Sequence, residues 1–219
     1  MRNIKFEIGE YYHIYNRGVD KRKVFINEND YQRFLDSIKN FNNESTHAQR
    51  DYKKRMRSKL SFEYSKLSFR SIPQLTEFIC YCLNPNHYHF LLKQIREGGI
   101  EKFMHKLGLG YSKYFNKKYN RSGSLFEGTY KAVHIQDNSG FTWLSAYVNG
   151  NPEIHQIAKA DNYQWSSYPC YLNKRKRDIC NKEDILGQFS SIDEYKDFVN
   201  IVILEAMAKK EAMKNYVLE

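Results

Sequence analysis

The pattern of apolar and polar positions predicts four strands in the first part of the chain. Residues 11–16 are aromatic and β-branched and stop just before a glycine, as expected of a strand that leads into a loop. Residues 76–83 and 87–94 are apolar segments joined by Asn-Pro-Asn, which is strong turn chemistry, so they predict a hairpin. Residues 124–135 indicate a further strand.

Apolar residues at helical spacing predict helices over residues 29–41 and 100–118. A third helix is expected to start at residues 137–139 and to be stopped by Pro152, and residues 183–219 predict two or three more. Because strands and helices mix without a regular βαβ repeat, we expect an α+β sandwich. It would have one mainly antiparallel central sheet flanked by helices, plus a C-terminal helical extension.

The length and composition predict one globular unit with an appendage. A chain of 219 residues with 41% hydrophobic and 16% aromatic content can bury a substantial core. We expect a main domain over residues 1–172, interrupted by a basic insertion at residues 43–72, and a basic linker with a helical extension over residues 173–219. Between residues 43 and 71 there are eight basic and three acidic residues. This segment is either an arm that holds nucleic acid or a solvated linker.

The surplus of basic residues indicates an anionic partner. The 35 Lys and Arg exceed the 25 Asp and Glu, which gives a net charge of +10 and attracts polyanions. Nucleic acid is the leading candidate, and a basic surface that only aids solubility is the alternative. The 18 Tyr and 14 Phe favour nucleic acid further, because exposed aromatic rings are stacking platforms for unpaired bases.

Cysteine usage and hydropathy indicate the compartment. Four cysteines in a chain of this size do not form the pattern of a disulfide framework, and a reduced, cytoplasmic setting fits them. The N-terminus lacks an apolar signal core, and no run is long enough to span a bilayer. We therefore expect a soluble protein that is not exported and does not enter a membrane.

The most informative motif is His87-Tyr88-His89 at the start of the second hairpin strand. Successive side chains of a strand point to opposite faces, so both imidazoles lie on one face and Tyr88 on the other. Such a pair can hold one metal ion, since a neutral imidazole is a common ligand. Two histidines that are packed or hydrogen-bonded without a metal are the alternative.

A second candidate pair lies on the helix that leads to Pro152. Tyr147 and Asn151 are four residues apart and share a helix face, so a phenol and an amide oxygen can point at one site. The residue before a proline is disfavoured in a helix, which would make Asn151 the terminal residue with its amide reaching outward. The alternative is that Tyr147 belongs to the apolar stripe and Asn151 only caps the helix.

Four motifs occur along the chain in a fixed order. They are Asn86-His87-Tyr88-His89-Phe90-Leu91-Leu92, Ser122-Gly123-Ser124-Leu125-Phe126-Glu127-Gly128, Tyr147-Val148-Asn149-Gly150-Asn151-Pro152 and Trp165-Ser166-Ser167-Tyr168. In these motifs and their order, the chain resembles the REP-associated tyrosine transposases of the single-tyrosine HUH endonuclease and transposase superfamily. The similarity runs from about residue 11 to about residue 199, and it decides between the alternatives for both pairs.

The resemblance implies a ferredoxin-like HUH sandwich and assigns roles to four residues. His87 and His89 would ligate a divalent ion, Asn151 would be the third ligand, and Tyr147 would be the nucleophile. The ion would be Mg²⁺ or Mn²⁺, since an amide oxygen suits the first and imidazoles the second. The implied activity is metal-dependent nicking and strand transfer on single-stranded DNA through a 5′-phosphotyrosine.

The expected DNA partner is a single strand with hairpin or palindromic repeats, bound by a monomer or a homodimer. We expect basic residues along the domain and in the following linker to contact this DNA. They are Arg17, Lys113, Lys117, Lys118, Arg121, Lys131, Lys174, Arg175, Lys176 and Arg177.

Some residues depart from the family pattern, and rival readings stay open. His155 stands in a run where relatives carry a short apolar, Arg, small-residue sequence, and Thr129 replaces a usual Arg.

Tyr111 or Tyr114 is an alternative nucleophile on another amphipathic helix. The rival function is a nucleic-acid-binding protein of the same fold that has lost catalysis. A phosphoesterase with two histidine motifs is disfavoured, because no second His-x-Ser/Thr strand is present. We expect the Trp165–Tyr168 motif to be a structural clasp.

Overall fold

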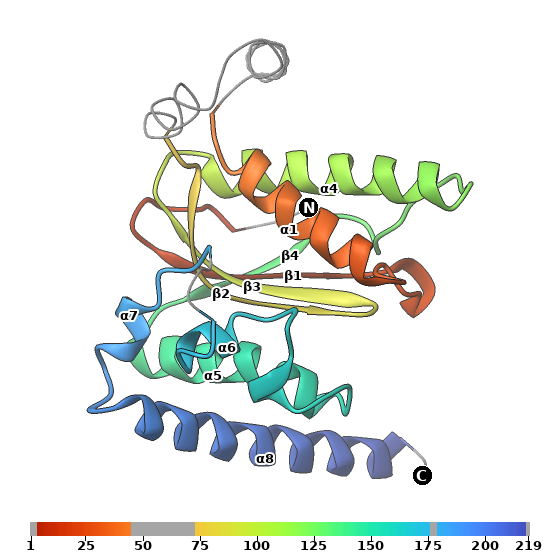
Figure 1. Cartoon of the computed structure of the whole chain (residues 1–219). Helices are drawn as coiled ribbons and strands as arrows, with labels where there is room; N and C mark the ends of the chain where they lie inside the picture. Colours follow the sequence, from red (N-terminus) through yellow and green to blue (C-terminus); the bar gives the residue numbers. More distant parts are fainter. Residues whose placement is uncertain (1–3, 45–72, 176–178, 218–219) are drawn as a thin grey trace.

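Four antiparallel strands form one sheet in the order β2-β3-β1-β4 (Figure 1). The computed structural model describes residues 4–44, 73–175 and 179–217. Its elements in chain order are β1 (Tyr11–Arg17), the 3-10 helix η1 (Val19–Lys21), α1 (Glu28–Phe41), β2 (Thr76–Asn84), β3 (His87–Gln94), α4 (Gly99–Lys118), β4 (Lys131–Ile135), α5 (Asn138–Ile154), the 3-10 helix η2 (Ala160–Asn162), α6 (Tyr168–Tyr171), α7 (Glu183–Leu186) and α8 (Ile192–Val217).

The strand order follows from the connections. α1 leads from β1 to β2, β2 and β3 form the predicted hairpin, and α4 leads to β4, so β1 lies between β3 and β4. This is the βαββαβ arrangement of ferredoxin-like folds. The predicted α+β sandwich with a mainly antiparallel sheet is therefore confirmed, and α8 provides the C-terminal helix.

Helices cover both faces of the sheet. In Figure 1, α1 and α4 lie on one face, α5 and α6 lie on the other, and α8 runs along the outer side of α5. α5 is thus enclosed between the sheet and α8, which requires small or apolar residues on both of its sides. Gly150 meets this requirement at the closest approach, because a Cβ there would lie 2.6 Å from Ile203 Cγ1 of α8.

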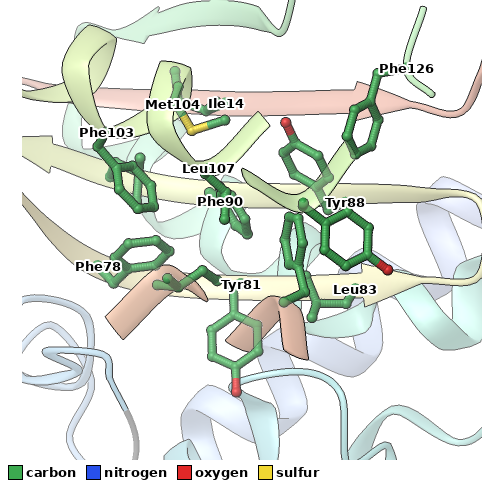
Figure 2. Close-up of a cluster of buried hydrophobic side chains, with 14 of the residues drawn as sticks. Ile14, Phe78, Tyr81, Leu83, Tyr88, Phe90, Phe103, Met104, Leu107 and Phe126 are labelled. Carbon is green, nitrogen blue, oxygen red and sulfur yellow. The ribbon is translucent and has the colours of Figure 1, made fainter. Parts of the chain in front are cut away.

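Side chains of β3 are divided between two cores. Tyr88 and Phe90 join Leu107 of α4 in an aromatic-rich core on the α1 and α4 face (Figure 2). Leu91 packs in the second core with α5 and α8. The predicted orientation of this strand is confirmed, and His87 lies on the α5 side.

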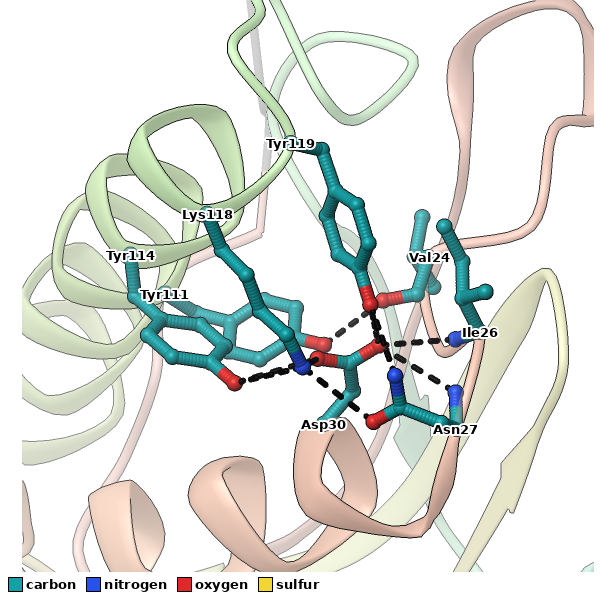
Figure 3. A network of polar contacts seen from close by, with 8 residues as sticks. All are labelled: Val24, Ile26, Asn27, Asp30, Tyr111, Tyr114, Lys118 and Tyr119. Atoms are coloured by element: carbon teal, nitrogen blue, oxygen red, sulfur yellow. Dashed lines mark hydrogen bonds and ion pairs between the residues drawn. The ribbon is translucent and has the colours of Figure 1, made fainter.

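A buried carboxylate links α1 to the end of α4 (Figure 3). The Asp30 side chain has 0% exposure. Its oxygens accept hydrogen bonds from Lys118 Nζ at 2.6 Å, the Tyr119 hydroxyl at 2.6 Å, the Tyr114 hydroxyl at 3.1 Å, Ile26 N at 2.9 Å and Asn27 N at 3.3 Å. Burial alone would raise the pKa of Asp30, but the bonds from Lys118 and Tyr119 outweigh it and lower that pKa. The same carboxylate forms a capping box at the start of α1.

The fourth strand is shorter than the sequence predicts. β4 starts at Lys131, so the strand expected from residue 124 is wrong over its first half. Gly123 and Gly128 have φ angles of +82° and +74°, which turn the chain on either side of Phe126. Phe126 forms a single bridge to Gly18 and fills the first core instead of continuing a strand.

Pro152 does not stop its helix. α5 continues to Ile154, and His155 N still bonds to Asn151 O at 3.1 Å. A proline removes one backbone donor, and the packing of α5 against the sheet and α8 holds the remaining turn in place. Asn151 is fully buried within the helix, so its predicted position at an outward-facing end is wrong.

The predicted division at residue 172 stays a prediction. Residues from both sides of it share the second core, where Val148 and Tyr171 pack with Tyr195 and Val199. The basic insertion at residues 43–72 lies outside the described residues apart from its first two positions. None of the described helices has the length and apolar character needed to cross a bilayer.

Candidate active site

His87, His89 and Tyr147 line one pocket of about 470 Å³ at the start of β3. β3 places the two imidazoles on the same face, and α5 passes over that face with Tyr147. The ring centroids of His87 and His89 are 5.2 Å apart, and the Tyr147 ring is 5.9 Å from His89 at an interplanar angle of 89°. The residues that the sequence assigns to one site are thus brought together.

The hydrogen bonds of His87 determine which of its ring nitrogens has the lone pair. Its Nδ1 lies 2.6 Å from Asn86 Oδ1, a carbonyl oxygen that only accepts, so Nδ1 carries the hydrogen. Nε2 then has the lone pair and accepts from Asn84 Nδ2 at 2.8 Å. A histidine fixed in this way by a neighbouring oxygen is typical of metal ligands.

His89 is held by a histidine from the neighbouring strand. His13 Nε2 lies 2.8 Å from His89 Nδ1, and the two rings stack at 5.1 Å. When Nδ1 of His89 donates to His13, its Nε2 lone pair is available in the pocket. Burial lowers the pKa of His13 to about 4, and burial also lowers that of His89 well below its usual value, so both rings are neutral near pH 7.

Asn151 supplies an oxygen beside His87. Its Oδ1 lies 3.4 Å from His87 Nε2 and accepts a hydrogen bond from Asn84 Nδ2. The Nδ2 atom of Asn151 is buried and has no hydrogen-bond partner among the described residues. The amide nitrogen of Asn84 therefore faces two lone-pair atoms that converge, and it lies where a cation shared by them would be.

These atoms fit a divalent metal as two imidazole nitrogens and one amide oxygen. Within the described ranges, no group of three or more His, Cys, Asp and Glu side chains is placed to hold a metal. The fit therefore depends on the oxygen of Asn151, and the ion, Mg²⁺ or Mn²⁺, stays a prediction.

Tyr147 lies beside these groups with its phenol partly enclosed. Burial raises its pKa above the ordinary value of a tyrosine, and the Asn151 side chain lowers it in part. Its ring stacks on Trp143, one turn earlier on α5, at 5.3 Å and 10°. Trp143 is 41% exposed, so a flat aromatic surface adjoins the phenol at the edge of the pocket.

The rival tyrosines lie elsewhere. Tyr111 is fully buried in the first core, where its hydroxyl donates to Val24 O at 2.6 Å. Tyr114 bonds to Asp30. Both are on α4, on the face of the sheet opposite α5, so neither reaches the histidine pair.

The basic residues that the sequence assigns to DNA fall into three groups. Arg17 and Lys131 line the pocket, and Arg17 forms an ion pair with Glu127 at 2.9 Å. Lys113, Lys117, Lys118 and Arg121 lie on or just after α4, away from the pocket, and Lys118 is held by Asp30. Lys174 pairs with Asp161 at 2.7 Å, and Arg175 donates to Ser166 O at 2.7 Å. Lys176 and Arg177 lie outside the described residues. Their contacts with DNA stay predictions.

The Trp165–Tyr168 motif forms the predicted clasp. Ser167 Oγ accepts from Tyr81 N at 2.9 Å and donates to Asn149 Oδ1 at 2.7 Å, so it joins β2 to α5. Leu83 N donates to Trp165 O at 3.0 Å. These bonds fix α5 over the sheet and thereby the position of Tyr147.

The sequence patterns did not identify His13, Asn84 or His155 as site residues. Asn84 belongs to the Asn-Pro-Asn turn motif, and His13 belongs to another strand whose register the sequence does not specify. His155 lies 4.8 Å from His87 by ring centroids and lines the same pocket. Its position as a polar ring four residues after Asn151 was the available signal.

Comparison with known families finds a match over part of the chain. Residues 74–151 match the family described as Transposase IS200 like, a range that contains His87, His89 and Tyr147 and ends at Asn151. No match is found among curated proteins.

A solved structure supports the fold. A structure described as a REP-associated tyrosine transposase bound to a REP hairpin is similar with a TM-score of 0.54 and 13% identity, over 82% of this chain and 88% of that chain. The resemblance that the four motifs indicate is confirmed: the chain is similar to IS200-like transposases over residues 74–151 and shares the fold of a REP-associated tyrosine transposase.

Proposed function

We propose that this protein is a metal-dependent single-stranded DNA endonuclease and strand transferase that uses Tyr147 as its nucleophile. The observation that carries the proposal is the pocket itself. It joins the phenol of Tyr147 and the neutral imidazoles of His87 and His89, from two elements that are far apart in the sequence. The buried amide oxygen of Asn151 lies behind this lining, 3.4 Å from His87 Nε2.

Two sets of side chains at the pocket, the proposed metal ligands and two basic residues, suit the binding of a phosphate group. His87 Nε2, His89 Nε2 and Asn151 Oδ1 would hold a divalent cation, which when bound polarises a phosphate and neutralises charge that develops in the transition state. Arg17 and Lys131 at the pocket wall add positive charge for the DNA backbone. The stacked surface of Trp143 and Tyr147 can receive an unpaired base.

Tyr147 would attack the phosphorus atom of one phosphodiester. The bond from the phenol oxygen to phosphorus forms while the bond from phosphorus to the 3′ oxygen breaks. The phenol proton leaves to solvent, and the departing 3′ oxygen gains a proton. The products are a 5′-phosphotyrosine and a free 3′-hydroxyl, and attack by a second 3′-hydroxyl on this link would rejoin strands without ATP.

The substrate we propose is a single strand with a hairpin or palindromic repeat. The similar solved structure is described with a REP hairpin, and the net charge of +10 favours nucleic acid. Whether the protein acts as a monomer or a homodimer stays a prediction.

The test is covalent capture of a labelled, hairpin-bearing single strand from the DNA that flanks the gene. Tyr147→Phe removes one oxygen and is expected to abolish the adduct. Tyr114→Phe makes the same change on α4 and is expected to keep it. An adduct of normal yield in the Tyr147 variant would show that another residue is the nucleophile.

A paired test addresses the metal. Replacing both His87 and His89 with alanine is expected to remove cleavage and to leave salt-sensitive DNA binding, because phosphate contacts come from Lys and Arg. Cleavage that persists in this double variant with a chelator present would exclude the proposed role of the metal. Loss of all DNA binding would instead make the histidines part of the DNA-binding surface.

A further inference from the structure

One histidine of the pocket has no role in the proposed reaction. His155 follows directly after α5, and its ring is 4.8 Å from that of His87 at an interplanar angle of 62°. It lines the same pocket as His89 and Tyr147. The sequence departs from the family pattern at this position, so the family assigns it no function.

Lys210 from the C-terminal helix α8 determines which nitrogen of the His155 ring carries the hydrogen. Its Nζ lies 3.3 Å from His155 Nδ1 and 3.4 Å from Ile154 O. An ammonium group only donates, so Nδ1 of His155 must accept and therefore has the lone pair. In a neutral imidazole the hydrogen is then on Nε2, the ring nitrogen that does not contact Lys210.

His155 and His87 thus have opposite tautomers in one pocket. Nδ1 of His87 faces an acceptor, Asn86 Oδ1, and leaves a lone pair on Nε2, as a metal ligand requires. Nδ1 of His155 faces a donor and leaves an N–H on Nε2. An N–H repels a cation and attracts a phosphate oxygen.

We propose that His155 is a phosphate-binding residue of this site, whose Nε2–H donates to a non-bridging oxygen of the bound DNA strand. Lys210 is the positioning residue that fixes the tautomer, which makes α8 a part of the site. The inference rests on the proposed function only for the identity of the ligand as DNA, since the tautomer follows from the contacts of this chain.

The experiment measures binding apart from catalysis. A fluorescent single strand carrying the flanking hairpin is titrated by anisotropy with the full-length protein in the presence of a chelator. His155→Phe keeps an aromatic ring beside His87 and removes the donor, and it is expected to weaken binding about ten-fold, which is the size of one hydrogen bond to a charged group. His155→Gln restores an N–H donor and is expected to recover most of the affinity.

Lys210 has a matched control on the same helix. Lys210→Met and Lys209→Met each remove one positive charge, and Lys209 is an exposed neighbour. Lys210→Met is expected to weaken binding several-fold more than Lys209→Met. In ¹⁵N spectra of the imidazoles, the wild type is expected to show hydrogen on Nε2 of His155, and Lys210→Met is expected to show a mixture of tautomers.

Three results would overturn the proposal. They are unchanged DNA affinity in a folded His155→Phe protein, a wild-type spectrum with the hydrogen on Nδ1, or a loss of Mn²⁺ affinity in the same variant, which would make His155 a ligand. These readouts need no cleavage. If Tyr147 proved not to be the nucleophile, the effect of His155 on DNA affinity would still decide this inference separately.

Discussion

Replacing Asp30 with alanine is expected to lower the free energy of unfolding by about 3 kcal/mol. The carboxylate is fully buried and accepts five hydrogen bonds from α4, from the start of α1 and from the loop before it. Breaking a buried ion pair on one side costs about 3–5 kcal/mol. The lower end applies because the Lys118 side chain is 28% exposed and can regain water.

The assay is urea unfolding at pH 7 with thermal unfolding alongside. A loss of about 3 kcal/mol corresponds to a melting temperature roughly 6–12 °C lower in a chain of this size. Asp36→Ala is the matched control, because this carboxylate is also on α1 and accepts one bond, from Gln32 at 3.0 Å. We expect the control to change the free energy by less than about 0.5 kcal/mol.

The stability that Asp30 contributes is expected to fall in acid. The folded state lowers the pKa of Asp30, so its contribution is present above the unfolded pKa of about 3.9 and is lost as pH falls through the lower folded value. The difference between the wild type and Asp30→Asn should therefore shrink below about pH 4. A loss under 1 kcal/mol at pH 7 in Asp30→Ala, or a difference that grows in acid, would refute the reasoning.

Three further variants test other parts of the structure. His13→Ala is expected to weaken Mn²⁺ binding about 10- to 100-fold in calorimetry, because it removes the partner that orients a proposed ligand; an unchanged affinity would count against that orientation. Gly150→Ala should lose about 1–3 kcal/mol in urea unfolding, since its Cβ would meet Ile203, whereas Gly108→Ala, with open space around it, should lose none. Lys118→Met should lower stability more than DNA affinity, because its ammonium is bound to Asp30; a large drop in affinity without a loss of stability would contradict this.

The local periodicity of the sequence is sufficient to predict part of the candidate site. The alternation along residues 87–92 correctly separated the histidines from Tyr88, and the four-residue spacing correctly placed Tyr147 and Asn151 on one face. Both patterns depend only on neighbours in the sequence. They required no knowledge of which strands pair.

The rest depended on tertiary structure. His13 reaches His89 because β1 and β3 pair with Tyr15 opposite His89, and nothing in either strand alone specifies that register. A proline such as Pro152 predicts the end of a helix, yet packing on both sides of α5 overrides this effect. The link from His155 to Lys210 joins residues 55 positions apart, beyond any local pattern.

The alternation along β3 also limits how this protein can evolve. A slip of β3 by one residue against β1 would exchange its two faces. Tyr88 and Phe90 would then enter the pocket, and the histidines would be forced into the aromatic core. Changes that shift this register would therefore disrupt folding as well as the site, whereas substitutions on the pocket face leave the register unchanged.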